Sequence, residues 1–188
     1  MAITSLLLDI GVARVADAAF KVSGGSQIDM SEITDVAANI NWNSAVGKGE
    51  GAIFAISTKA ESIDITCGAM TIDVTSLALL MGSTAPALTG ATPNFILTTN
   101  LKVTDVAPYF AFGIKSSDIT GITVPTANEA IPADCHFIFP KCKIRKVTNI
   151  LPEVEGFATV KFEFTAVRST DTLMTIIENQ TTAAIALT

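Results

Sequence analysis

The strongest constraint on the fold is an alternation of apolar and polar residues with a period of two. In residues 158–166 (ATVKFEFTA), apolar side chains occupy every even position and polar side chains every odd one. Residues 61–67 repeat the alternation, with Ile63, Ile65 and Cys67 on the apolar side. Because successive side chains of a strand point to opposite faces, both segments are predicted to be strands with one buried face.

Other segments carry the same signal. Residues 95–104 and 109–115 alternate, and 105–108 is expected to form a turn, because Pro108 has no N–H to donate to a ladder. Weaker strand patterns are found at 3–10, 33–42, 135–148 and 173–178. The pattern predicts a mainly β chain, an antiparallel sandwich or barrel.

One segment has a helical period instead. In residues 73–82 (DVTSLALLMG), Leu77, Leu80 and Met81 are spaced i, i+3, i+4. Asp73, Thr75 or Ser76 can cap its beginning, and Gly82 can end it. A single short amphipathic helix is therefore predicted, packed across a sheet or the mouth of a barrel.

Three stretches are expected to be connections, at 43–51, 83–93 and 116–132. The first is glycine-rich (NSAVGKGEG) and the last is long and polar, so both are predicted to be extended loops or hairpins that other copies order. Neither repeats nor a boundary between domains can be recognised, and residues 1–188 are interpreted as one domain.

Composition points to burial against neighbours. The chain of 188 residues is 49% hydrophobic and 16% charged, whereas soluble domains average about 25% charged residues. Its mean hydropathy is +0.49, yet no apolar run approaches the roughly 18 residues of a membrane-spanning helix. The net charge of −6 argues against tight binding of nucleic acid, which requires a basic surface.

The first ten residues and the cysteines bear on the compartment in which the chain folds. Residues 1–10 (MAITSLLLDI) have no basic leader region, so folding in a cytoplasm is expected. Cys67, Cys135 and Cys142 are predicted to be buried free thiols, and a bridge between the last two stays an open alternative.

Catalytic patterns are weak. Cys135 and His136 are neighbours in a predicted strand, so their side chains diverge, and no CxxC unit completes a zinc site. Gly47-Lys48-Gly49 lacks the spacing of a phosphate-binding loop. Glu153 and Glu155 flank a turn without the aromatic platforms of a glycosidase. We therefore predict no catalytic residue, cofactor site or metal ligand, and expect a protein that is not an enzyme.

The order of elements resembles the tail tube proteins, or major tail proteins, of tailed bacteriophages. Two phrases carry the resemblance. Residues 70–82 read as a strand running into a leucine-rich short helix that ends in glycine. Residues 142–171 read as a basic strand, a turn, Gly-Phe, an alternating phenylalanine strand and a Thr/Asp turn. The resemblance extends over most of the chain from about Ile53 onward, whereas the first 50 residues match loosely.

The resemblance implies a structural subunit of the virion tail, assembled in the host cytoplasm. Six copies would form a ring, and stacked rings a tube through which genomic DNA passes without tight binding. Tape-measure, sheath or tail-terminator proteins would be further partners. Candidate residues facing the channel are Ser62, Asp64, Thr66, Thr98, Asn100 and Thr104. Candidates for the contact between rings are Gly47, Lys48, Gly49, Glu50 and Gly51.

Two alternatives stay open at this level. The first is a β-sandwich binding or decoration module on a virion or cell surface, which would need an exposed aromatic platform or a metal cluster; the chain has one Trp and one Tyr. The second is a barrel-type hydrolase, which would need a deep pocket around His136 with a partner acid. The sequence does not discriminate between contractile and non-contractile tails, and it does not identify the host.

Overall fold

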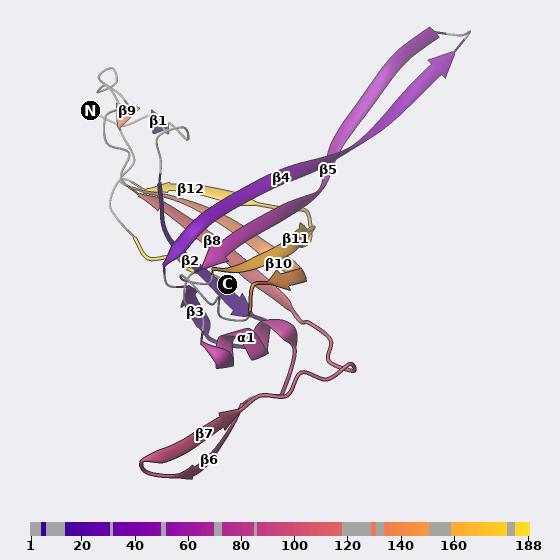
Figure 1. The fold of residues 1–188 in the computed structure, drawn as a ribbon. Helices are drawn as coiled ribbons and strands as arrows, with labels where there is room; N and C mark the ends of the chain where they lie inside the picture. The colour runs from indigo at the N-terminus through magenta and orange to yellow at the C-terminus, as the bar shows by residue number, and fades with distance from the viewer. Residues whose placement is uncertain are drawn as a thin grey trace.

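The computed structural model describes residues 5–6, 14–30, 32–49, 52–69, 73–84, 86–117, 129–130, 134–150, 159–179 and 183–188. The strands are β1 (Ser5–Leu6), β2 (Arg14–Val22), β3 (Gln27–Met30), β4 (Ile33–Gly49), β5 (Ala52–Ala69), β6 (Ala87–Ala91), β7 (Asn94–Thr98), β8 (Tyr109–Ser117), β9 (Glu129–Ala130), β10 (Asp134–Thr148), β11 (Val160–Val167) and β12 (Thr175–Asn179), with one helix, α1 (Val74–Met81). Figure 1 shows their arrangement.

One large sheet organises the molecule. Its strands follow the order β3-β2-β8-β10-β11-β5-β4, β12 pairs with β10 as well, and every pairing in it is antiparallel. β10 pairs with β12 through Asp134–Ile138 and with β11 from Cys142 onward. Pro140 lies at the register shift against β8 between these halves, because it has no N–H for the ladder. The sheet therefore curls, and β2 approaches β4 without pairing with it.

The inner face of this sheet carries the core. Phe112 lies 4.6 Å from Phe164 and Phe110 lies 5.4 Å from Phe164 between ring centroids, both edge to face. Buried apolar residues from β2, β5, β8, β10 and β11 surround these rings. The alternation at 61–67, 109–115 and 160–166 places these side chains on one face. The opposite parity carries polar side chains in β5 and β11, and small residues, Ala111 and Gly113, in β8.

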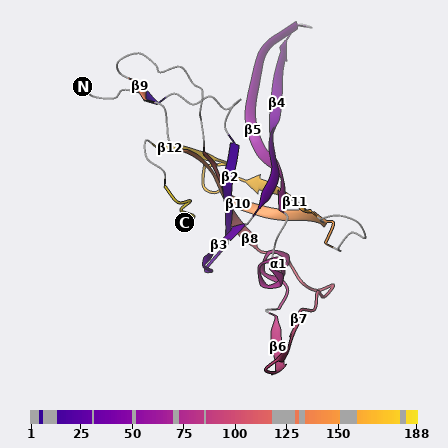
Figure 2. The same cartoon turned by 60° about the vertical axis from the view of Figure 1, so that its left-hand side comes forward.

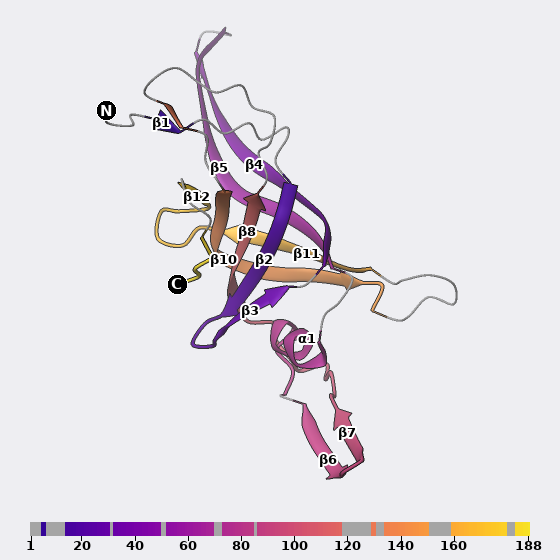
Figure 3. The same cartoon turned by 90° about the vertical axis from the view of Figure 1, so that its left-hand side faces the viewer.

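Helix α1 covers one end of the curled sheet (Figure 3), where Leu80 joins the core. Asp73 is its N-cap and accepts a hydrogen bond from the Ser76 N–H at 2.9 Å. Hydrogen bonds, first that of the Ser76 hydroxyl, lower the pKa of the Asp73 carboxyl. Gly82 ends the helix with φ of 71°, a left-handed conformation that glycine adopts without a steric penalty.

Most predicted elements are confirmed. The chain is mainly antiparallel β with one short helix, and the strands predicted at 61–67, 109–115 and 135–148 lie within strands of the large sheet. Of the strand predicted at 158–166, residues 160–166 lie in β11, residue 159 precedes it and residue 158 lies outside the described residues. The helix lies within residues 73–82, as expected. Among the described residues, no helix has the length and apolar character needed to cross a lipid bilayer.

The three predicted connections differ from the structure in part. Of the loop or hairpin predicted at 43–51, the hairpin forms, because β4 continues to Gly49 and pairs with β5 as far as Ala52; Glu50 and Gly51 lie outside the described residues. Residues 87–98, within and beyond the predicted connection at 83–93, form the two-stranded sheet β6–β7. Residues 116–132 are expected as a loop, but β8 extends to Ser117 and β9 occupies Glu129–Ala130; the remainder lies outside the described residues.

Candidate functional site

The hairpin β4–β5 extends well beyond the sheet that supports its base (Figures 1 and 2). β11 pairs with β5 only from Ser62 to Ala69, whereas β4 and β5 stay paired as far as Gly49 and Ala52. A register shift between Asn41 and Trp42 lies at the point where the hairpin leaves the sheet. Such bulges bend and twist a strand pair, so this one redirects the hairpin away from the body.

The projecting part of the hairpin exposes large apolar side chains. Trp42 is 61% exposed and Ile56 is 66% exposed, and Val46, the register partner of Ile56, is exposed as well. Trp42, Val46 and Ile40 share the parity of the inner face of β4. An isolated two-stranded hairpin is marginally stable in water. The exposed apolar face is therefore suited to contact with another molecule.

The opposite face of the hairpin base holds three of the predicted channel residues, Ser62, Asp64 and Thr66. The carboxylate of Asp64 accepts hydrogen bonds from the Thr165 hydroxyl at 2.6 Å and the Asn41 amide at 2.8 Å. Arg145 forms an ion pair with it at 3.1 Å. These groups lower the pKa of the Asp64 carboxyl, the Thr165 hydrogen bond contributing most. This face carries hydroxyl and amide groups together with charged side chains, and the charges of Arg145 and Lys146 are paired with Asp64 and Glu163.

The other three predicted channel residues lie elsewhere. Thr98 ends β7, in the separate sheet β6–β7, and Asn100 and Thr104 follow it in an irregular segment. The strand predicted at 95–104 ends at Thr98, so these residues do not share a sheet face with Asp64. The alternation in 95–104 is satisfied by a short hairpin, which a sequence pattern alone does not distinguish from a long strand.

The hairpin β6–β7 is the second apolar projection. It points away from the large sheet on the side opposite to β4–β5 (Figures 1 and 2). More than half of the side chain is exposed at Leu88, Phe95 and Ile96, and Leu97 is 49% exposed. No residue between Ala87 and Thr98 carries a charge. Exposed apolar surface of this kind marks sites of association.

An apolar groove of about 380 Å³ opens on the inner side of the sheet. Its lining comes from β2, β4, β5, β8, β10 and β12, and includes Val15, Val36, Phe137 and Ile176. β4 at one side of this opening pairs only with β5 within the described part of the chain. The groove therefore joins an open strand edge to the apolar face of the projecting hairpin, which contains Ile40 and Trp42.

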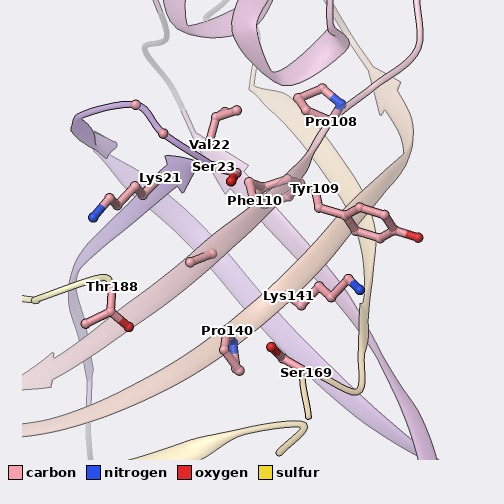
Figure 4. A pocket seen from close by; sticks show the side chains of 13 residues that line it. Lys21, Val22, Ser23, Pro108, Tyr109, Phe110, Pro140, Lys141, Ser169 and Thr188 are labelled. Atoms are coloured by element: carbon pink, nitrogen blue, oxygen red, sulfur yellow. The ribbon is translucent and has the colours of Figure 1, made fainter.

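A second, more open cavity of about 690 Å³ lies at the other end of the sheet (Figure 4). Tyr109 lines it, with the ammonium groups of Lys141 and Lys143 at 4.6 and 5.1 Å from its ring centroid. Cation–π contacts of this type fix the ring in place. Its described lining includes Lys21, Lys141 and Tyr109, and contains no histidine and no side-chain carboxylate.

Cys135 and His136, the candidate catalytic pair, lie on opposite faces of β10, as their neighbouring positions in a strand predict. Cys135 has the parity of the inner face and His136 that of the outer one, and both are buried. Burial raises the pKa of the Cys67 and Cys142 thiols to about 12, which keeps them protonated and unreactive. All three cysteines are buried, and none of them forms a disulfide. In the described residues, no group of three potential metal ligands occurs.

Sequence reasoning missed Trp42 as a surface residue, because the pattern placed it at the end of a strand before a loop. It missed Asp134 as well, whose buried carboxylate lies 3.5 Å from the His136 Nε2. The only available signal for Asp134 was a charged residue beside an apolar strand. No protein family model and no curated protein matches this sequence.

Proposed function

We propose that this chain is a structural subunit of a phage tail tube, which assembles into stacked hexameric rings around a channel for the genome. The observation that carries the proposal is the hairpin β4–β5, whose apolar side chains lie beyond the sheet, 61% exposed at Trp42 and 66% at Ile56. A strand pair of this length needs a surface to support it. A neighbouring copy in a ring supplies one.

The strand edges support the same proposal. Within the described residues β3 pairs only with β2, and β4 pairs only with β5. Open edges promote uncontrolled association, and a closed ring of subunits removes them by pairing each copy with the next. The two projecting hairpins point in opposite directions from the sheet (Figure 2), an arrangement that suits contacts to copies on either side.

The polar face around Asp64 supports a channel lining. Each lysine or arginine contact to phosphate adds affinity for DNA, whereas hydroxyl and amide groups do not. Asn41, Ser62 and Thr66 are uncharged, and the Arg145 guanidinium is balanced by Asp64. Lys59 and Lys143 lie on the same face, so we propose the part around Ser62, Asp64 and Thr66 as the channel lining. The function proposed here requires no turnover and no cofactor; tape-measure and sheath or terminator proteins are proposed partners.

Sedimentation and negative-stain microscopy of the purified chain test the proposal. We expect rings or tubes with sixfold symmetry. A monodisperse monomer at high concentration, without rings or filaments, would contradict it. The measurement needs no variant and no other component.

One observation favours a second candidate, a binding or decoration module. Trp42 and Tyr109 are both exposed, and Tyr109 lies in a cavity with two lysines. Such a module would bind a surface as a monomer or a small oligomer. Rings and tubes in the micrographs would exclude it, and a stable monomer would favour it.

A further inference from the structure

On the outer face of the large sheet, opposite to the phenylalanine core, the C-terminal residues 183–188 lie against a patch of small residues, and we call the surface that they cover the groove. We call residues 183–188 the strap. The groove floor is made of small residues, Ala19, Ala111 and Gly113. The strap places Ile185 and Leu187 on this floor, where they are 5% and 6% exposed.

Gly113 is essential to this fit. A Cβ atom at this position would lie 2.7 Å from Cγ2 of Ile185 and 2.9 Å from Cδ2 of Leu187. Both distances are shorter than van der Waals contact, and both strap atoms are ends of side chains. A larger residue at Gly113 would therefore displace the strap and leave the sheet itself unstrained.

One end of the groove recognises the backbone of the strap. The amide of Gln27 donates to the Ile185 carbonyl at 3.0 Å, and its oxygen accepts from the Leu187 N–H at 3.1 Å. This side chain thus makes the pair of bonds that a neighbouring strand would make. The Lys21 ammonium donates to the Leu187 carbonyl at 3.0 Å.

The other end holds the backbone of Ala183. Its N–H donates to the buried Asp134 carboxylate at 2.7 Å, and its carbonyl accepts from the Lys115 ammonium at 2.7 Å. Lys115 also lies 3.4 Å from Asp134, so the two charges compensate each other. The groove therefore contacts the backbone of the strap at Ala183, Ile185 and Leu187 and its two aliphatic side chains.

The strap is not built into the fold that it covers. Residues 183–188 form no strand, and five side-chain hydrogen bonds and two apolar side chains hold them. The main core lies on the other face of the sheet. Release of the strap would therefore uncover the groove without opening the core.

We infer that this groove is an exchangeable peptide-binding site, and that the ligand it takes from outside is the strap of a second copy. The inference rests on the proposed self-assembly, because neighbouring copies present their straps at high local concentration. Exchange between identical chains replaces each contact by the same contact, so its cost is low.

A labelled peptide measures the groove by itself. The probe is a fluorescein-labelled peptide with the sequence of residues 181–188 (TTAAIALT), titrated by anisotropy into full-length chains. In the wild type, the strap competes at an effective concentration on the order of millimolar. We expect the Ile185→Ser/Leu187→Ser chain to bind the peptide at least tenfold more tightly than the wild type does.

Two controls define the site. A peptide with serine at both aliphatic positions is expected not to bind, and adding Gly113→Val to the double variant is expected to abolish binding. Gln27→Ala, added to the double variant, keeps the apolar contacts and is expected to weaken binding, because it removes both hydrogen bonds to the peptide backbone. Equal binding of the two peptides, or unchanged binding after Gly113→Val and Gln27→Ala, would overturn the inference.

Complementation tests exchange between copies. The Gly113→Val chain keeps an intact strap but a filled groove, and the Ile185→Ser/Leu187→Ser chain keeps an open groove but a weakened strap. Native mass spectrometry of their mixture is expected to show mixed pairs in excess of those in a control mixture, in which the triple variant replaces Gly113→Val. No excess would contradict exchange.

The outcomes separate this inference from the proposed function. Rings or tubes without peptide binding would overturn the groove and leave the tube proposal in place. Peptide binding and complementation in a chain that forms no rings would retain strap exchange and contradict the tube.

Discussion

At the scale of single residues, Phe164 is central to the core, because its ring contacts both Phe110 and Phe112. Phe164→Ala would remove these aromatic contacts and leave a cavity, and we expect a loss of about 3–5 kcal/mol in the free energy of unfolding. Denaturant unfolding measures it. Ile56→Ala is the matched control, since Ile56 is 66% exposed and its loss should change stability by less than about 0.5 kcal/mol in the monomer.

The Asp64 carboxyl makes the free energy of unfolding depend on pH. Hydrogen bonds from Thr165 and Asn41 lower its pKa in the folded chain below the ordinary value of 3.8. The stabilisation is therefore complete above the unfolded-state pKa and is lost as pH falls through the lower, folded-state pKa.

We expect Asp64→Asn to flatten the decrease in stability below pH about 4. Urea unfolding at several pH values measures the slope. Asp171→Asn, at a side chain that is 88% exposed, is the control and should leave the slope as in the wild type. Equal slopes for Asp64→Asn and the wild type would show that the Asp64 network does not contribute.

At the scale of elements, the outer half of the hairpin β4–β5 is expected to contribute to assembly and little to the stability of the monomer. Its outer half is not paired with β11, so its side chains contribute little to the sheet. Burying a side chain such as Ile56 in a contact is worth about 2 kcal/mol, or roughly thirtyfold in affinity per contact.

We expect Trp42→Ser/Ile56→Ser to keep the far-ultraviolet circular dichroism of the wild type and to raise the concentration needed for assembly by more than tenfold. Light scattering against concentration measures this. Lys59→Ser, on the opposite face of the same hairpin, is the control and should assemble normally. Normal assembly of the double variant would show that this apolar face is not a contact.

The same elements show what a sequence pattern can predict. The alternation at 160–166 and the caps Asp73 and Gly82 are local features, so the strand and the helix are predicted correctly. Residues 43–49 contain glycines that suggest a loop, but pairing with β5 keeps them in a strand. Strand pairing is a contact between distant segments, and it overrides local preference there.

At the scale of the whole molecule, the tube proposal implies that one face of the large sheet points toward the channel. The polar face with Thr66 would line the channel, whose wall must not retain phosphate. Thr66 lies opposite Glu163 on β11 and Ala37 on β4.

We expect Thr66→Lys to assemble into normal rings and to slow DNA release from complete particles at low salt, with recovery at high salt because counterions screen the new charges. A DNA-release assay at two salt concentrations measures it. Thr172→Lys, in the turn that follows β11, adds the same charge and is the control outside this face. Release at the wild-type rate at both salt concentrations would place Thr66 outside the channel.

The sequence by itself determined the mainly β class, the parity of the strands around the core and the single capped helix, because each depends on neighbours within a few positions. Only the tertiary structure decided that β4 and β5 leave the sheet with Trp42 exposed, and that Thr98 lies on another sheet from Asp64. The groove under Ile185 and Leu187 was decided there as well. These features depend on which strands pair and where each pairing ends, and the free energy of such contacts is shared between residues far apart in the chain.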